Sequence, residues 1–358
     1  MPDMGLRIGQ WATGNVGRAA LRGAIGHPHL DPVAVLVSSP SKDGVDAGEL
    51  AGMGTTTGVR ATTDRQALLD AEPDVVCYAA MADDRLGEAV EDLCWLLREG
   101  VDVVSACPVF LQFPHGVADE LGEQVHRAAL EGGASLFVNG IDPGFANDTL
   151  PLVLSGICER IDTLRCTEIL DYASYRQPKV MREIMGFGQP VDEVPLLLQP
   201  GVLTLAWGSV LHQLAAGLGV QLERIIEHHE RVAAPHDVAT ATGTIVQGTA
   251  AGLRFELTGL VSGEPRLALE HVTRTHPDLA PHWPQPAGQG CERVEITGSP
   301  DCTLDLQLRG ADDDPNDAGL TVTAMRLLNA APHVTAAKPG LLTALDLPLV
   351  TGHGLMRG

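Results

Sequence analysis

The chain is short of positive charge. Its 358 residues include only 24 Lys or Arg against 46 Asp or Glu, which gives a formal net charge of −22. Such a chain repels phosphate backbones, so no nucleic-acid partner is expected. Lysine is the scarcer cation and occurs three times. A lysine that falls inside a candidate binding loop is therefore a notable feature of this sequence.

Paired cysteines and long apolar runs are also missing. The seven cysteines are scattered and form no C-x-x-C pair, which is typical of a reduced protein rather than a disulfide-stabilised one. No apolar run is long enough to cross a membrane, and the N-terminus has no charged leader followed by an apolar run. We therefore expect a cytoplasmic protein without a membrane partner.

The chain does have enough apolar residues, 44% of the total, for two domains. Residues 1–145 alternate short apolar strands with amphipathic helices, which predicts a doubly wound parallel sheet. Residues 146–325 contain longer strand-like runs and predict an α+β domain with a mainly antiparallel sheet. Residues 326–358 are expected to be helical around Pro332 and to pack back on the first domain. The predicted fold class is α/β.

The stretch WATGNVGRAAL, residues 11–21, is similar to the dinucleotide-binding fingerprint G-x-G-x-x-G. Gly14 and Gly17 hold its second and third places, where they admit the pyrophosphate and the packing of helix on strand. Ala12 holds the first place, and costs about 1–2 kcal/mol if that residue needs positive φ. A tight turn without a ligand is the alternative. The expected cofactor contacts are Ala12, Thr13, Gly14, Asn15, Val16, Gly17 and Arg18, with Ala80 after a later strand.

The end of the second predicted strand indicates which dinucleotide is bound. An NAD site usually has Asp or Glu there to bind the ribose hydroxyls. This chain has Ser38 and Ser39, followed by Lys42. Hydroxyls and a cation suit the 2′-phosphate of NADP, so NADP is the expected cofactor and NAD remains possible. The alternative is that Lys42 is a solvated loop residue.

Five stretches together resemble the dihydrodipicolinate-reductase-like proteins, and among them 2,4-diaminopentanoate dehydrogenase and the native amine dehydrogenases. They are GNVGRAALR, SPSKDGVDAGEL, IDPGFANDTLPL, MGFGQP and RLLNAAPHVTAAKPGLLTALDLPLVTG. The resemblance implies an NAD(P)-dependent oxidoreductase with a Rossmann domain and a second domain that binds a small carbonyl or amine substrate and forms a homodimer. The implied reaction is reductive amination of a carbonyl compound and its reverse.

The sequence departs from this family at the catalytic glutamate. Where the relatives have that glutamate, this chain reads SACPVFLQFP, with Pro108 or Val109 at the position. Neither side chain can bind an amine or transfer a proton. We therefore expect ammonia-dependent amination to be weak or absent. Reduction of a ketone or preformed imine is one alternative, and a non-catalytic NADP-binding regulatory protein is another.

Several polar residues could carry the reaction instead. His115 follows the missing glutamate and has a suitable intrinsic pKa. Tyr172 and Tyr175, two of only three tyrosines, lie on a run that lines the substrate pocket in the family. Asp142 stands where relatives have Asn beside the nicotinamide, or could only cap the following helix. The substrate pocket is further expected to contain Val109, Glu168 and Asn329.

The histidines are not expected to bind a metal ion. The pair in EHHE, residues 227–230, is predicted on a solvated helix, where adjacent side chains diverge. His271, His276 and His282 lie near a proline-rich loop, and we do not predict a metal site there.

Overall fold

The computed structural model describes residues 5–356, which group into two compact units. One unit comprises the chain up to Ile141 together with the chain from Leu320 onward. The other comprises Asp142–Gly319. None of the helices among residues 5–356 combines the length and apolar character that crossing a bilayer requires.

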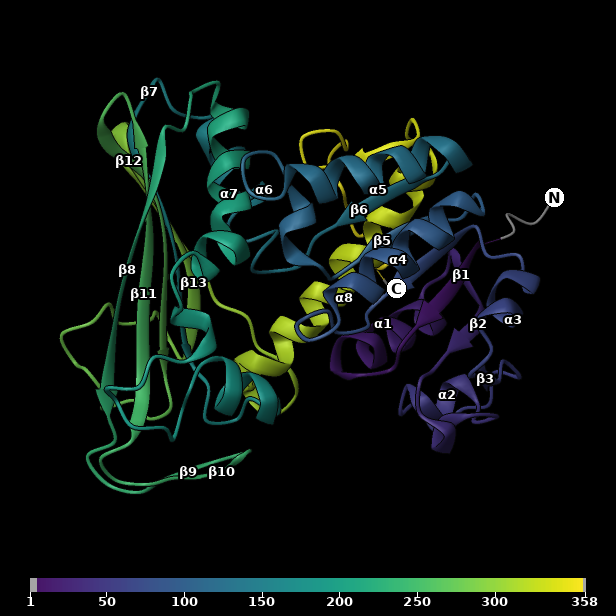
Figure 1. The fold of residues 1–358 in the computed structure, drawn as a ribbon, viewed down its shortest axis with the longest axis horizontal. Coiled ribbons are helices and arrows are strands. Elements are labelled where there is room, and N and C mark those ends of the chain that lie inside the picture. Colours follow the sequence, from purple (N-terminus) through teal and green to yellow (C-terminus); the bar gives the residue numbers. More distant parts are fainter. Residues whose placement is uncertain (1–4, 357–358) are drawn as a thin grey trace. The chain divides into compact units, whose positions relative to one another are not determined.

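The first unit contains a seven-stranded sheet in the order β15-β6-β5-β4-β1-β2-β3, and every pairing in it is parallel (Figure 1). The strands are β1 (Leu6–Trp11), β2 (Leu30–Leu36), β3 (Ala61–Thr62), β4 (Val75–Tyr78), β5 (Asp102–Ser105), β6 (Ser135–Val138) and β15 (Gly340–Leu342). The helices are α1 (Asn15–Gly26), α2 (Ala47–Leu50), α3 (Arg65–Asp70), α4 (Leu86–Arg98), α5 (Asp119–Gly132) and α8 (Pro315–Thr335), with 3₁₀ turns at Pro40–Lys42 and Val109–Gln112.

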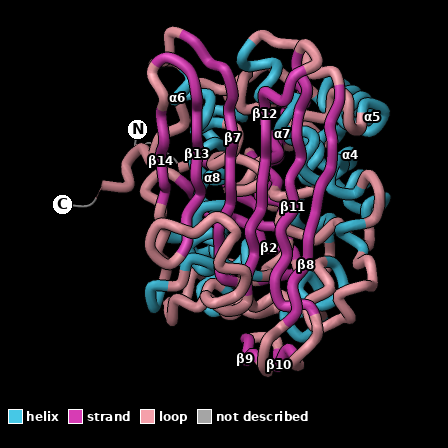
Figure 2. The backbone as a smooth tube through the Cα atoms, turned by 90° about the vertical axis from the view of Figure 1, so that its left-hand side faces the viewer, coloured by secondary structure: helices cyan, strands magenta, loops and turns pink. Residues whose placement is uncertain are grey.

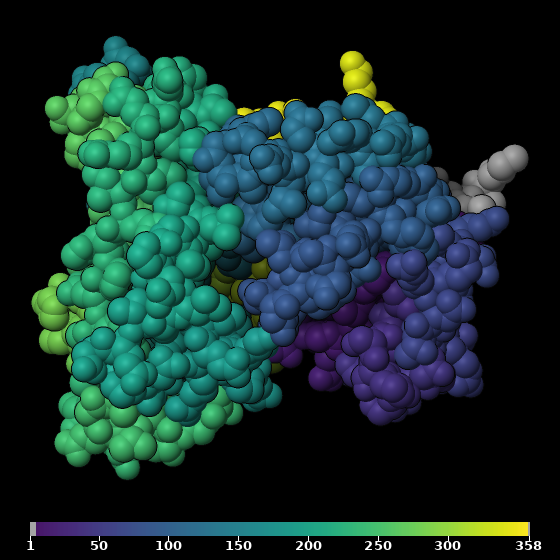
Figure 3. Space-filling model, in the orientation of Figure 1, coloured from purple at the N-terminus to yellow at the C-terminus, as the bar shows by residue number. Residues whose placement is uncertain are grey.

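Helices cover both faces of this parallel sheet. Adjacent residues of a strand point to opposite faces, and Val75 packs with α1 and α8 while Val76 packs with α4 and α5. The residues of α4 and α5 form the outer surface on that side, coloured blue in Figure 3. Burial on both faces explains why these strands read as continuous apolar runs. The predicted α/β class and doubly wound sheet are confirmed.

The C-terminal stretch is helical around Pro332, as expected, but also contains a strand that was not expected. Helix α8 runs through Pro332 and ends at Thr335, and β15 then pairs in parallel with β6. Pro339 precedes that pairing and Gly340, which has φ 150°, is its first residue, and neither continues a helix. The chain therefore adds a seventh strand that helical periodicity did not indicate.

The second unit contains a six-stranded sheet in the order β14-β13-β7-β12-β11-β8, which Figure 2 shows face on. Only β7 and β12 pair in parallel, so the sheet is mainly antiparallel as expected. The strands are β7 (Arg160–Asp171), β8 (Arg224–Ala233), β11 (Ala250–Val261), β12 (Glu264–Arg274), β13 (Gly290–Ser299) and β14 (Cys302–Leu306), with a hairpin of β9 (Val238–Thr240) and β10 (Gly243–Ile245). The helices are α6 (Thr149–Ser155) and α7 (Val202–Leu218), with short helical turns at Val180–Ile184, Leu196–Leu198 and Ala311–Asp313.

Helix α7 packs on one face of this sheet. Its Val210, Leu211 and Leu214 are buried in one cluster with strand residues such as Leu253 and Leu269. The α7 face therefore holds the apolar core of the unit.

One local expectation is wrong. The EHHE histidines lie on strand β8, not on a helix, and both His228 and His229 are exposed. Further along the chain, Gly243, with φ 109°, opens β10, and Gly248, with φ 85°, separates β10 from β11.

Candidate active site

The loop between β1 and α1 keeps the backbone of a dinucleotide-binding turn although alanine replaces its first glycine. Ala12 has φ 70°, in the left-handed region that favours glycine, so the alanine costs about 1–2 kcal/mol. The buried Gln10 side-chain amide donates to the Ala12 carbonyl at 2.9 Å. This bond fixes the turn in the conformation that alanine disfavours.

The two remaining glycines of the loop serve different purposes. A Cβ on Gly17 would lie 2.2 Å from the Ala12 carbonyl oxygen, so glycine is needed for α1 to pack against the turn. A Cβ on Gly14 would meet nothing within 4 Å, which leaves open space where α1 begins at Asn15. Helix N-termini beside such space bind phosphate groups. The loop therefore fits a dinucleotide pyrophosphate.

The loop after β2 is tied to this turn by Lys42. Its Nζ donates to the carbonyl oxygen and the hydroxyl of Thr13, at 3.0 and 2.9 Å. The Ser39 and Ser41 hydroxyls are hydrogen-bonded to one another at 2.8 Å. This loop therefore gathers a cation and several hydroxyls next to the glycine loop, without an acidic residue over residues 38–42.

Two other expected cofactor contacts, Arg18 and Ala80, and the expected substrate-pocket residue Asn329 also lie in the first unit. The Arg18 side chain lies over Gly52: a Cβ on Gly52 would be 2.1 Å from Nη2 of Arg18. Ala80 follows β4, and its carbonyl accepts from the Cys107 thiol. The Oδ1 atom of Asn329 on α8 is buried without a hydrogen-bond donor from residues 5–356. A buried acceptor in this state is costly, and a donor from a bound cofactor would satisfy it.

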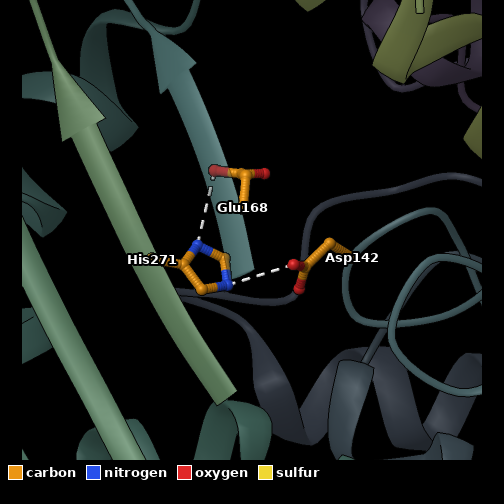
Figure 4. Close-up of side chains that lie close together, drawn as sticks. All are labelled: Asp142, Glu168 and His271. Atoms are coloured by element: carbon orange, nitrogen blue, oxygen red, sulfur yellow. Dashed lines mark ion pairs between the residues drawn. The ribbon is translucent and has the colours of Figure 1, made fainter. Parts of the chain in front are cut away.

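Four ionisable side chains gather on the α7 face of the second-unit sheet. The strand register sets Glu292 of β13 beside Glu168 of β7, and Glu168 beside His271 of β12. Paired residues project to the same face of a sheet. Asp142, which precedes α6, faces the same imidazole (Figure 4). We call Asp142, Glu168, His271 and Glu292 the acidic cluster.

The imidazole of the acidic cluster lies between two carboxylates. His271 Nε2 is 3.1 Å from Asp142 and Nδ1 is 3.4 Å from Glu168, and the exposed fractions of these side chains are 3–7%. Trp207 donates its indole N–H to Asp142 at 2.7 Å, and Tyr172 donates its hydroxyl to Glu168 at 2.9 Å. A continuous polar chain therefore runs from Trp207 to Tyr172 through the imidazole.

Aromatic rings fix the orientation of that imidazole. Phe255, the register neighbour of His271, stacks on it with ring centroids 4.5 Å apart and planes 14° apart. Trp207 meets it at 4.8 Å and 65°. Tyr175 lies 4.8 Å from Tyr172. The partly exposed Tyr172, Tyr175 and Trp207 thus form the aromatic side of the cluster.

Burial and neighbouring charges set the protonation states. Burial alone would lower the pKa of His271, but Asp142 and Glu168 outweigh it and raise that pKa well above its usual value. Burial and the Glu168 charge raise the pKa of Tyr172 well above 10.0, so this phenol stays protonated. Burial, then the charges of Glu168 and Asp142, raise the pKa of Glu292 well above 4.5.

Asp142, Glu168 and His271 each offer a metal-ligand atom within 4.8 Å of the others. The two carboxylates, however, face different ring nitrogens (Figure 4). An ion bound at one nitrogen would lie in the ring plane, on the side away from the other carboxylate. The raised pKa of His271 also opposes loss of the proton that metal binding requires. The geometry is that of two ion pairs.

The structure brings together four of the residues chosen from the sequence: Asp142, Glu168, Tyr172 and Tyr175. The alternative that Asp142 caps the next helix is wrong, because Asp148 accepts from the Thr149 N–H at the start of α6.

His115 and Val109 belong to the first unit. The His115 side chain is 73% exposed and faces Asp119 at 3.8 Å. Val109 begins the 3₁₀ turn after β5.

Sequence reasoning missed Trp207 and Glu292, and considered His271 only as a metal ligand. Alternate residues of β12, Leu267 and Leu269, lie on the α7 face, and His271 is the next residue in that alternation. The period of two could therefore have placed His271 on the buried face of the sheet. Glu292 is set beside Glu168 by strand pairing across more than a hundred residues, which no local pattern shows.

Comparisons with known proteins agree with this fold. A sequence model of the 2,4-diaminopentanoate dehydrogenase C-terminal domain matches residues 145–356. An amine dehydrogenase from Streptomyces virginiae is 44% identical over 344 residues, 95% of either chain. The 2,4-diaminopentanoate dehydrogenase of Acetoanaerobium sticklandii is 24% identical over 265 residues, 73% of this chain and 70% of that protein.

The solved structure of an amine dehydrogenase from Mycobacterium smegmatis superposes with a TM-score of 0.79 over 97% of both chains. At 22% identity this likeness supports the fold alone. The family match and the Streptomyces relative show more: the chain belongs to the family of 2,4-diaminopentanoate dehydrogenase and the amine dehydrogenases, and it is an NAD(P)-dependent oxidoreductase.

Proposed function

We propose that this oxidoreductase interconverts a small amine and its imine with NADP(H), and that Asp142 and Glu168 of the acidic cluster bind the nitrogen. The observation behind this proposal is the imbalance of charge around the imidazole: two carboxylates, Asp142 and Glu168, flank a single cationic group, His271. A bound nicotinamide supplies or accepts the hydride. The protein's own side chains have to bind the substrate, orient it and manage its protons.

The sign of the buried charge favours a C=N bond over a C=O bond. An iminium ion is a cation, and carboxylates in a low-dielectric site stabilise it strongly. Reduction of a carbonyl instead builds negative charge on oxygen, which the same carboxylates oppose. Carbonyl reduction remains the second candidate, because the Tyr172 hydroxyl and His271 could provide protons to that oxygen.

Glu168 is the proposed proton acceptor for the amine. It lies between the Tyr172 hydroxyl and His271 Nδ1, so a proton taken by its carboxylate has two routes onward. Asp142 holds the opposite nitrogen of the imidazole and is itself held by Trp207. Asp142 therefore orients the ring and keeps it charged. Tyr175 and Trp207 are proposed to contact the apolar part of the substrate.

The loop after β2 supports a preference for NADP over NAD. Lys42 and the serine hydroxyls provide donors for a 2′-phosphate, while an acidic partner for ribose hydroxyls is missing from residues 38–42. The proposed cofactor site also includes the glycine loop, Ala80 and Asn329.

We also propose that the second unit is the substrate-binding and dimerisation domain. The face of its sheet away from α7 carries charged side chains in opposed pairs, such as Arg165 and Arg254, which both donate to Glu270. A network of alternating charge can pair with a second copy of itself. Light scattering coupled to gel filtration tests this, and a monomeric mass contradicts it.

Assays with NADPH and a panel of small ketones, aldehydes and preformed cyclic imines test the main proposal. We expect imines to be reduced faster than carbonyl compounds, and ammonium to add little because the family glutamate is missing. Val109→Glu should raise the ammonium-dependent rate, up to about 10²-fold if the new carboxylate acts as a general base. Preferred carbonyl reduction would favour the second candidate. Tight NADPH binding without any turnover would favour a regulatory protein.

A further inference from the structure

The Glu292 carboxyl belongs to the acidic cluster but has no role in the proposed binding of the substrate or transfer of its protons. It is 6% exposed, and its register partner Glu168 projects from the neighbouring strand to the same face. Directly paired residues on antiparallel strands have Cβ atoms about 4.5–5.5 Å apart. Two buried carboxyl groups at this separation do not both ionise readily, because each charge opposes the other.

The cluster contains only one group that can neutralise its carboxylates. His271 faces Asp142 and Glu168, each through its own nitrogen. With both of these ionised, two negative charges face one positive charge. A charged Glu292 would add a third negative charge that has no counterion within the cluster, and burying an unpaired charge costs several kcal/mol.

We propose that Glu292 is a positioning residue: its uncharged carboxyl limits the cluster to one excess negative charge, the complement of a single iminium or ammonium ion. This inference rests on the proposed function for the identity of that cation. The charge state of Glu292 itself can be measured without a substrate.

Hydrogen bonding indicates which of the two glutamates holds the proton. Glu168 accepts from the Tyr172 hydroxyl and faces the imidazole, so its carboxylate has two polar partners. Within residues 5–356, none of the hydrogen bonds of the cluster reaches the Glu292 carboxyl. Burial first, and then Glu168 and Asp142, raise the pKa of Glu292, while His271 lowers it. Cys166 is the other ionisable side chain that interacts with Glu292, and burial raises the pKa of its thiol well above 9.0.

Infrared spectroscopy of the whole apoprotein in deuterated buffer tests the charge state directly. The wild type at pH 7 should show the C=O stretch of a protonated buried carboxyl, and that band should be absent from Glu292→Gln. Glu295→Gln is the matched control, because Glu295 lies three residues along β13 and projects to the other face; it should leave the band unchanged. If Glu292→Gln fails to fold, Glu292→Met, whose side chain has a similar volume, replaces it. The band should be absent from the spectrum of that variant too.

The pH dependence of stability provides a second measurement. A carboxyl whose pKa is raised in the folded state binds more protons folded than unfolded, so its contribution to stability falls as pH rises from about 4.5 through the folded pKa. The melting temperature of the wild type should therefore fall relative to Glu292→Gln over this range. Glu295→Gln should keep the wild-type profile.

The outcomes separate this inference from the proposed function. A wild-type spectrum without a protonated carboxyl band, or a band that persists in Glu292→Gln, overturns the role of Glu292. If the band is assigned to Glu292 but no imine is reduced, the proposed reaction fails while the charge state stands. If imines are reduced, Glu292→Gln should retain kcat/KM at pH 7 within about tenfold, a change of ~1.4 kcal/mol. A larger loss would mean that an ionised Glu292 is required.

Discussion

Ala12 is a single residue whose conformation conflicts with its side chain. At φ 70° it has a geometry that glycine adopts without strain. Ala12→Gly removes about 1–2 kcal/mol of strain, offset in part by the greater freedom of glycine in the unfolded chain. We expect an equal or higher melting temperature and an NADPH affinity within about tenfold of the wild type.

The control for that substitution is Ala19→Gly, in the interior of α1, which should destabilise the protein by about 1 kcal/mol. Urea denaturation and NADPH fluorescence titration measure both quantities. A gain in NADPH affinity far above tenfold for Ala12→Gly would mean that alanine has impaired the cofactor site, and would favour the regulatory alternative.

Lys42 is the residue on which the proposed NADP preference depends. A charge-assisted hydrogen bond to a phosphate contributes about 1.5–3 kcal/mol, so Lys42→Ala should weaken NADPH binding by about tenfold or more and leave NADH binding little changed. Lys338→Ala, which removes an exposed lysine elsewhere in the first unit, is the control. Equal losses of affinity for both cofactors would show that Lys42 stabilises the glycine loop through Thr13 and does not bind the 2′-phosphate.

Strand pairing decides which of the cluster residues meet. Glu168→Gln keeps the side-chain shape and removes the proposed proton acceptor, whose loss typically costs about 10²–10⁴ in rate. NADPH affinity should not change, because the cofactor loops lie in the other unit. Glu256→Gln, on the opposite face of β11, should retain activity. Comparable losses of kcat for both variants would point to a disturbed sheet.

His271 links β12 to β7 and to Asp142 through its charge. Because its pKa is raised in the folded state, the stability from its ion pairs is fully present below pH 6.5 and is lost as pH rises through the folded pKa. His271→Gln should cost about 3–5 kcal/mol at pH 6 and less at alkaline pH. Urea unfolding over that range measures this, and a cost independent of pH would show that the imidazole is neutral.

Some of these structural elements could be predicted from the sequence and others could not. Strands and helices of the first unit follow from apolar runs and amphipathic periods, since each is a local pattern. The glycine loop was found because strand, turn and helix are contiguous. The acidic cluster was found only in part, because the neighbours of Glu168 come from strands about 100 residues away. Strand β15 was missed because three residues are too few to show a period.

For the whole molecule, the division into two units predicts where each ligand protects the backbone. A cofactor at 100 times its Kd stabilises the folded state by about 2.7 kcal/mol. If the glycine loop and the loop after β2 hold it, NADPH should slow amide hydrogen exchange in β1, α1 and residues 38–42. Exchange in β8 and β14, the edge strands of the second-unit sheet, should change little. Mass spectrometry of peptic fragments measures this, with Lys42→Ala as the control that should reduce protection by NADPH. Protection confined to the second unit would contradict the proposed cofactor site.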